Sequence, residues 1–153
     1  MTAFQPKDLG FAARVRESFA QQTVMATIGS SLAGIAPGRV EILLPYRADL
    51  CQQNGFLHAG IVTVIADSAA GYAAFTLYAA NEAVLTSELT VHLLSPAVGE
   101  RFLAVGQVLK PGRRLAVAET EVFAEKAGEA RLIAKLIATL VRMQVPQEEG
   151  AGP

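Results

Sequence analysis

Several residue types that often mark a functional site are scarce in this chain, which has no tryptophan, two histidines and one cysteine, Cys51. A single cysteine excludes an internal disulfide, and no histidine lies near Cys51 at a motif spacing, which argues against a thiol nucleophile. An excess of one charge is also lacking, because 13 basic residues stand against 14 acidic ones. Bulk electrostatics therefore predict neither a nucleic-acid nor a membrane-surface partner, and a small-molecule partner is favoured.

The N-terminal segment lacks the basic-then-apolar order of a secretory signal, so we expect a cytoplasmic protein. Apolar residues, by contrast, make up 52% of the 153 residues, enough for one domain with a sizeable core. We predict a single domain over residues 1–144 and a flexible, polar tail over residues 145–153. The high apolar fraction also suggests surface that is buried between subunits.

The longest apolar segment, residues 59–80, nearly has the length that crosses a bilayer. Alanine, glycine, serine and threonine make up much of it, Asp67 lies near its centre, and the basic flanks that would set an orientation are missing. We therefore expect no membrane span. A helix that is apolar on all sides must be buried by the rest of its own protein, so other elements are predicted to surround it.

Downstream of this helix, short turns separate segments that alternate in the manner of β-strands. Residues 83–94 alternate with period two, which places Leu89 and Val91 on one face and Thr86 on the other. Three more runs follow, and the four together are predicted to form an antiparallel meander. These three runs are residues 101–110, 115–125 and 130–143. The elements predicted upstream are a helix over residues 8–22 and a hairpin of residues 26–35 and 39–45.

This order of elements suits a strongly curved antiparallel sheet wrapped around one central helix. LHAG leads into the helix, Asp67 follows His58 by nine positions, and the next strand ends in LLSPA before a KPGRR turn. In this combination the chain resembles the PaaI-like branch of the hot-dog acyl-CoA thioesterases. The resemblance runs from Arg39 to Arg142 and implies an α+β hot-dog fold. RVRESF, nearer the N-terminus, resembles a short helix that some members carry.

The most informative single residue is Asp67. Burying an isolated carboxylate costs several kcal/mol, so a lone aspartate in an apolar helix needs a partner or a task. No residue three or four positions away on the helix is cationic. One interpretation is structural: Asp67 faces a wet crevice or caps a neighbouring backbone N–H. The other is functional: Asp67 is a base beside a substrate cleft, where the small Gly71 and Ala74 let a ligand approach.

Residues around Asp67 complete a hypothesis for thioester hydrolysis. A carboxylate takes a proton from water or attacks the carbonyl carbon itself. The start of the long helix, His58-Ala59-Gly60, presents unpaired N–H groups and the positive end of the helix dipole, which suit an oxyanion. The resemblance implies the Ala59 N–H as oxyanion donor, in place of a glycine in an HGG motif. It also implies Thr86 as the hydroxyl that orients the water or the carboxylate.

Two further parts of the site are implied by the resemblance. An amide side chain shortly before the histidine is expected near the thioester; we favour Gln52 and keep Asn54 beside it, and either one is alternatively an ordinary loop amide. The KPGRR turn is expected near the coenzyme A phosphates, which the cations Lys110, Arg113 and Arg114 suit. Its alternative role is that of a solvated turn.

Neither a metal nor a cofactor is expected. His58 has no second histidine nearer than His92 and belongs to no metal-binding motif. A histidine that pins its loop by hydrogen bonds is therefore the favoured interpretation of His58. His92 is expected at a sheet edge or an interface.

The resemblance implies an acyl-CoA substrate and a homodimer or homotetramer, in which residues 52–60 of one subunit face Asp67 and Thr86 of the other. The acyl group is either a medium-chain aliphatic one or an aromatic one, and Asp67 acts either as a general base or as a nucleophile; the sequence leaves both alternatives open. Because fold does not fix function, two rival functions are kept. A hot-dog dehydratase or hydratase is disfavoured because its histidine motif is missing, and a non-hydrolytic acyl-CoA-binding protein is disfavoured by the carboxylate in the helix.

Overall fold

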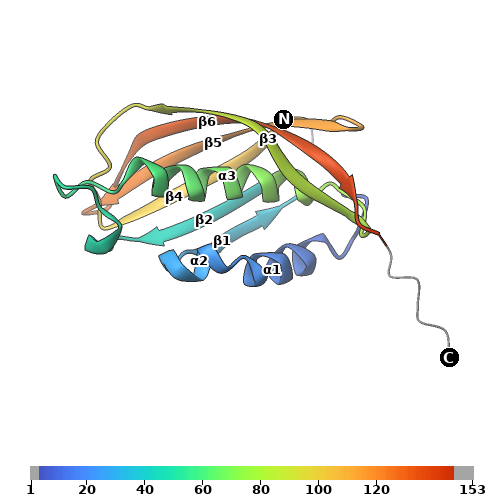
Figure 1. Cartoon of the computed structure of the whole chain (residues 1–153), viewed down its shortest axis with the longest axis horizontal. Coiled ribbons are helices and arrows are strands. Elements are labelled where there is room, and N and C mark those ends of the chain that lie inside the picture. Colours follow the sequence, from blue (N-terminus) through green and yellow to red (C-terminus); the bar gives the residue numbers. More distant parts are fainter. Residues whose placement is uncertain (1–3, 147–153) are drawn as a thin grey trace.

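The computed structural model describes residues 4–146, in which six antiparallel strands form one sheet that curves around the long helix α3 (Ala59–Phe75) (Figure 1). Two short helices precede the sheet, and α1 contacts both β1 and α3. The predicted α+β hot-dog fold is therefore confirmed. No helix in this part of the chain has the length and apolarity to cross a membrane. The remaining elements are α1 (Phe11–Gln21), α2 (Thr23–Ile28), β1 (Ser31–Ala36), β2 (Arg39–Pro45), the 3-10 helix η1 (Ala48–Leu50), β3 (Glu82–Leu93), β4 (Arg101–Lys110), β5 (Leu115–Lys126) and β6 (Glu129–Gln144).

Helix α3 lies so close to the sheet that its docking point leaves no room for a side chain on β4. A Cβ atom at Gly106 would lie 2.2 Å from the carbonyl oxygen of Ala69. Across the strand pair from Gly106, the buried Thr120 donates a hydrogen bond from Oγ1 to the carbonyl oxygen of Ala66, at 2.8 Å. One steric contact and one hydrogen bond thus fix the middle of α3, and with it the position of Asp67.

The predicted four-stranded meander is wrong in its strand order. β3 does not pair with β4, the next strand in the chain; it pairs with β6 and forms one edge of the sheet, in the order β1-β2-β4-β5-β6-β3. The connection over residues 94–100 must therefore cross three strand spacings, about 14 Å, and an extended segment reaches that far because each residue covers about 3.3 Å. This arrangement lets the sheet close around α3 from a second side (Figure 1).

The N-terminal predictions need two corrections. The single helix predicted over residues 8–22 divides at Gln22, and α2 continues to Ile28, into the segment predicted as the start of the hairpin. Gly29 ends α2 in the left-handed conformation, with φ of 77°, which glycine adopts easily because it has no Cβ atom. β1 therefore begins only at Ser31. The tail predicted for residues 145–153 lies, from residue 147 onward, outside the described residues.

The buried helix predicted over residues 59–80 ends earlier, at Phe75. Arg14 of α1 donates hydrogen bonds to the carbonyl oxygens of Phe75, Tyr78 and Ala79, at 3.3, 2.7 and 2.6 Å. Its guanidinium group supplies donors that the carbonyls at a helix end lack, and it places a positive charge at the negative end of the helix dipole. Arg14 thereby also anchors α1 against α3.

Candidate active site

Asp67 emerges from the middle of α3 and receives one side-chain hydrogen bond, from Thr86 on β3. The Thr86 Oγ1 and Asp67 Oδ1 atoms lie 2.7 Å apart, a short distance of the kind expected for a hydroxyl bound to a carboxylate. Asp67 is half-buried, and it forms no ion pair within residues 4–146. The carboxylate is therefore oriented by one bond and keeps acceptor capacity for water or substrate.

A β-bulge in β3 places Thr86 on the same side of the sheet as Asp67. Thr86 and Leu89 both pair with buried residues of β6, so both face the helix. The register shifts directly after Thr86, and the extra residue is Ser87. The prediction that Thr86 and Leu89 lie on opposite faces is therefore wrong, because strict alternation does not account for the extra residue. Bulges often re-aim a side chain in this way next to an active site.

Asp67 and Thr86 line a cleft of about 470 Å³ between α1, α3 and β3. The sequence analysis missed five polar residues of this cleft. They are Ser18, Gln21, Gln22, Ser68 and Tyr72. The sequence did contain a signal for Ser68 and Tyr72. They lie four positions apart on one side of the helix, and they directly follow Asp67 and Gly71, respectively. No local pattern links α1 to this cleft, so sequence reasoning could not find Ser18, Gln21 and Gln22.

His58 organises the N-terminus of α3. Its Nδ1 atom accepts a hydrogen bond from the Gly60 N–H at 2.8 Å, which makes His58 the N-cap of the helix. Its own backbone N–H donates to the carbonyl oxygen of Leu50 at 3.0 Å, which ties the loop to η1. The Gly60 N–H is thereby engaged, whereas the Ala59 N–H has no acceptor within residues 4–146. Ala59 therefore presents a free donor at the positive end of the helix dipole.

Of the two candidate amides, Gln52 shares a cleft with Ala59. This second cleft, of about 350 Å³, is also lined by Leu93 of the edge strand, and Asn54 is not among its residues. Asn54 is exposed, and its backbone N–H donates to the side-chain oxygen of Gln52. The structure thus brings Gln52, rather than Asn54, to the N-terminal end of α3.

Within one chain these residues form two separate groups. We call Asp67 and Thr86 the carboxylate half-site, and Gln52 and Ala59 the helix-end half-site. Ala59 and Asp67 are eight residues apart on the same helix, which is about 12 Å along its axis. One thioester carbonyl cannot touch both, because a hydrogen bond spans about 3 Å. The fold of a single chain therefore does not assemble the predicted site.

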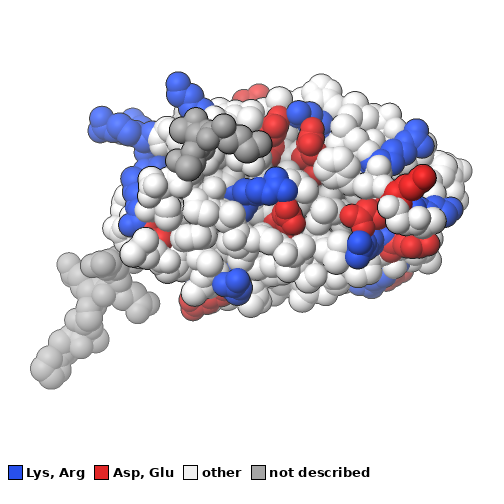
Figure 2. Space-filling model, turned by 180° about the vertical axis from the view of Figure 1, so that it is seen from behind, with Lys and Arg blue, Asp and Glu red and all other residues white. Residues whose placement is uncertain are grey.

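The basic turn between β4 and β5 lies at the other end of α3 from His58. Arg113 lines a pocket together with Leu77, which lies two residues after the end of the helix. Lys110, Arg113 and Arg114 are exposed and form no ion pair in the part of the chain that the structure describes. Seen from behind, charged side chains of both signs are spread over a largely uncharged surface (Figure 2). The three cations of the turn are thus available to an anion.

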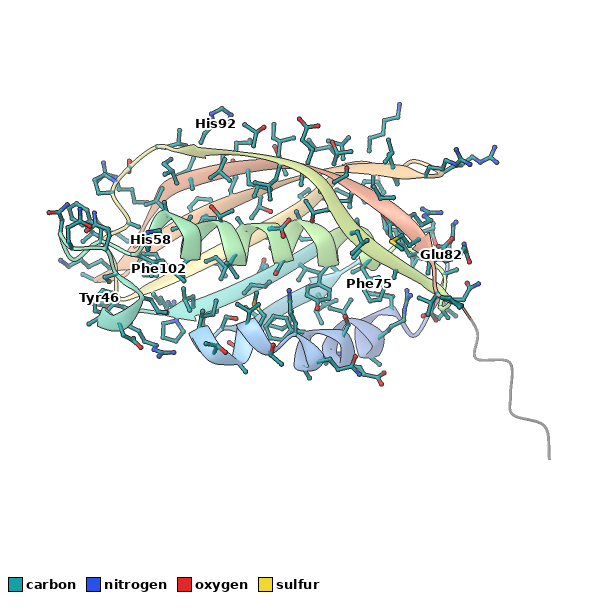
Figure 3. The ribbon with its side chains drawn as sticks, viewed as in Figure 1. Tyr46, His58, Phe75, Glu82, His92 and Phe102 are labelled. Carbon is teal, nitrogen blue, oxygen red and sulfur yellow. The ribbon has the colours of Figure 1, made fainter. Side chains whose placement is uncertain are left out.

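The two histidines belong to different elements. His58 lies at the start of α3, and His92 points outward from the edge strand β3 (Figure 3). Between residues 4 and 146, no three histidine, cysteine, aspartate or glutamate side chains are grouped as metal ligands would be. The edge position predicted for His92 is confirmed.

Comparison with known proteins identifies the family. Residues 54–130 match the model of the Thioesterase superfamily. The chain belongs to the Thioesterase superfamily. A thioesterase family protein from Silicibacter pomeroyi, known from a crystal structure, is 52% identical to this chain, with a TM-score of 0.87. That match covers 88% of this chain and 99% of the Silicibacter protein. No curated protein matches the chain.

Two more distant structures share the fold of this Thioesterase superfamily member. A thioesterase from Haemophilus influenzae is 15% identical, covers 97% of this chain and 99% of its own, and has a TM-score of 0.79. The PaaI protein of E. coli, from the phenylacetic acid degradation operon, is 17% identical, covers 89% of this chain and 97% of its own, and has a TM-score of 0.76. The resemblance to PaaI-like hot-dog thioesterases is thus confirmed.

Proposed function

We propose that this Thioesterase superfamily protein hydrolyses acyl-coenzyme A thioesters and that Asp67 activates the water or attacks the carbonyl. The observation that carries the proposal is the Thr86–Asp67 hydrogen bond beside an open cleft. It holds a half-buried carboxylate in one orientation, with no cation paired to it in the described residues. A carboxylate kept uncompensated in this way suits proton removal better than it suits a structural role.

The proposed chemistry balances with water as the only co-substrate. Asp67 removes a proton from water while the water oxygen bonds to the carbonyl carbon, and the carbonyl oxygen becomes negative. The Ala59 N–H donates to that oxygen, the C–S bond breaks, and the coenzyme A thiolate leaves and takes up the proton. Direct attack by Asp67 expels the coenzyme A thiolate and gives a mixed anhydride. Water then cleaves the anhydride to the free acid and the Asp67 carboxylate, and the thiolate takes up the proton that this releases. In either route Thr86 orients the carboxylate and Gln52 positions the thioester.

The separation of the two half-sites implies a second copy of the chain. The edge strand β3 offers a surface for it, because backbone groups along one side are not paired and Leu85 and Leu93 are 56% and 57% exposed. Two copies that pair their β3 strands antiparallel about a twofold axis also run their α3 helices antiparallel. We therefore propose a homodimer, and a homotetramer built from it, in which the helix-end half-site of one subunit faces the carboxylate half-site of the other.

The assembly is tested by light scattering at micromolar concentration. The proposal requires at least twice the 16.1 kDa mass of the chain. A stable monomer that retains full hydrolytic activity would overturn it, because one chain cannot bring both half-sites to one carbonyl.

The basic turn is proposed to bind the phosphates of coenzyme A. Lys110, Arg113 and Arg114 are exposed and without ion pairs in the described residues, and phosphate oxygens accept charge-assisted hydrogen bonds from such groups. Contacts of this kind, far from the reacting carbon, act alike on the ground state and the transition state.

The deciding experiment incubates the purified protein with aliphatic and aromatic acyl-CoAs and a thiol reagent that detects free coenzyme A. Hydrolysis releases one thiol per substrate molecule. A dehydratase or hydratase changes the acyl chain without releasing thiol, and a binding protein changes nothing. Release of coenzyme A that depends on Asp67 supports the proposal; binding without release rejects it.

A further inference from the structure

A buried ion pair lies beside the basic turn, where β3 begins and β6 ends. Glu82, at the start of β3, is at the opposite end of α3 from His58 (Figure 3). Its side chain and that of Arg142 on β6 are only 8% and 11% exposed, yet Arg142 Nε lies 3.7 Å from Glu82 Oε2, beyond hydrogen-bond distance. Well-packed uncharged residues often replace a buried ion pair without loss of stability, so stability alone does not account for Arg142.

The surroundings of Arg142 hold its guanidinium group in one place. The Cζ atom lies 4.4 Å from the centroid of the Tyr78 ring and over its face, a cation–π contact. Tyr78 is 1% exposed, and the Ala79 N–H fixes Glu82 by donating to its Oε2 at 2.8 Å. Arg142 is therefore a rigid cation between two buried side chains.

From this position Arg142 holds the basic turn through two carbonyl groups. Its Nη2 donates to the carbonyl oxygen of Gly112 at 3.1 Å, and its backbone N–H donates to the carbonyl oxygen of Arg114 at 2.9 Å. Residues 111–114 belong to no strand, and they make no other hydrogen bond in the described part of the chain. Arg142 thus fixes the backbone of the turn on both sides of Arg113.

The pocket that Arg142 and Arg113 share suits an anion. It measures about 350 Å³, Lys7 contributes a third cation, and no acidic residue lines it. The chain folds back tightly at its rim, since a Cβ atom on Gly112 would lie 2.0 Å from the carbonyl oxygen of Leu115. The direction in which Arg113 meets an anion therefore depends on the backbone that Arg142 holds.

Resting on the proposed binding of coenzyme A at the basic turn, we propose that Arg142 is the positioning residue of that site. It holds the turn in the shape in which Arg113 and Arg114 meet the phosphates. A turn that is already ordered loses little conformational freedom on binding, so the affinity is higher. Without the Arg142 side chain the turn keeps its charges but has to be ordered by the ligand. The loss should therefore affect binding of coenzyme A and not the chemical step.

The test variant is Arg142→Met/Glu82→Gln. It removes the side-chain hydrogen bond to Gly112, leaves no buried charge without its partner, and keeps the net charge of the chain because one cation and one anion are lost together. Calorimetry gives the Kd of coenzyme A itself. Thiol release gives KM and kcat for the acyl-CoA that the wild type hydrolyses fastest.

We expect Kd and KM to rise by about threefold to tenfold, the usual effect of one lost hydrogen bond. The kcat should change by less than about twofold, because the turn does not touch the reacting carbon. The N-acetylcysteamine thioester of the same acyl group lacks the nucleotide, so its hydrolysis should stay the same.

A double-mutant cycle separates positioning from direct contact. In a protein that already carries Arg113→Ala and Arg114→Ala, the same variant should change Kd by less than about twofold, because the cations that Arg142 positions are gone. If Arg142 bound phosphate itself, the loss would be equal in both backgrounds.

Trypsin reports the shape of the turn without any ligand, because it cuts after the exposed Arg113 and Arg114. Cleavage there, identified by the masses of the fragments, should be about threefold to tenfold faster in the test variant, since one hydrogen bond fewer opposes opening of the turn. The matched control is Arg131→Met/Glu129→Gln, which removes an exposed arginine and an exposed glutamate at the other end of β6. It should change neither Kd nor cleavage at the turn.

Arg142→Lys replaces the test variant if that protein fails to fold. Lysine keeps a charge beside Glu82, but its single ammonium group lacks the fork that lets arginine face Glu82 and Gly112 together. Binding should weaken in the same direction.

The outcomes separate this inference from the proposed function. An unchanged Kd, with or without faster cleavage, overturns the inference, and so does a loss of affinity that persists in full without Arg113 and Arg114. No binding of coenzyme A by the wild type overturns the proposed function, and the inference with it. Binding without hydrolysis overturns the hydrolytic function alone. Weaker binding that requires Arg113 and Arg114, with faster cleavage of the turn and an unchanged kcat, supports the inference.

Discussion

Replacing Asp67 with asparagine removes the proposed base and keeps nearly everything else. The amide has the size of the carboxylate, and its oxygen still accepts the hydrogen bond that Thr86 Oγ1 gives to Asp67 Oδ1 at 2.7 Å. Helix α3 is fixed elsewhere, by the close contact at Gly106 and the Thr120 hydrogen bond, so the geometry of the site should persist. What disappears is the ability to take a proton or to attack a carbonyl.

The expected loss follows from that change. General-base help contributes about 10²- to 10⁴-fold, which corresponds to about 2.7 to 5.4 kcal/mol of activation free energy. We therefore expect kcat for acyl-CoA hydrolysis to fall at least about a hundredfold in Asp67→Asn. The melting temperature should stay equal or rise, because a neutral amide is cheaper to keep half-buried than a carboxylate without a cation. Acyl-CoA should still bind.

Thiol release measures hydrolysis, thermal melting measures the stability of the fold, and calorimetry with acyl-CoA measures binding. Asp49→Asn is the control, since Asp49, in η1, is an exposed carboxylate that forms an ion pair with Arg47. Thr86→Ala should lose less activity than Asp67→Asn, and Ser87→Ala, whose hydroxyl bonds to a backbone carbonyl of β6, should lose little. Near-full turnover by a folded Asp67→Asn protein would refute the reasoning, and a variant that unfolds would assign Asp67 a structural role.

Three further predictions use other parts of the fold. Gly106→Ala should lower the free energy of unfolding by about 2 kcal/mol or more in urea titration, because its Cβ would overlap the backbone of α3; an unchanged midpoint would contradict the docking described here. Charge reversal at Arg113 and Arg114 should raise KM for acyl-CoA much more than it lowers kcat and should hardly affect a short thioester without the nucleotide; an unchanged KM would make this segment only a turn. Burial raises the pKa of Tyr72 and Tyr78 above the ordinary value of 10.0, so their neutral forms stabilise the fold below pH 10 and this contribution is lost as pH rises through the raised pKa. The melting temperature should therefore decline above pH 10, and the decline should be shallower in a Tyr72→Phe/Tyr78→Phe protein.

The sequence by itself determined the elements and their chemistry. Runs separated by turn residues predicted strands over residues 101–110, 115–125 and 130–143. The structure has β4 over Arg101–Lys110, β5 over Leu115–Lys126 and β6 over Glu129–Gln144. Periodicity and turn residues are local properties, so a single sequence carries them. The carboxylate in the apolar helix was visible for a related reason, because an uncompensated charge among alanines is unusual wherever the chain folds.

The tertiary structure alone decided which of these elements meet. β3 lies beside β6 because the sheet must close around α3, and no local pattern favours β6 over β4 as its partner. The bulge at Ser87 turns Thr86 toward Asp67, 19 positions away in the sequence, and α1 brings Ser18 to Tyr72 across 54 positions. Arg14, also on α1, fixes where α3 ends. Such contacts join residues that are distant in sequence, and they form because whole surfaces pack together. No short stretch of the chain encodes that packing.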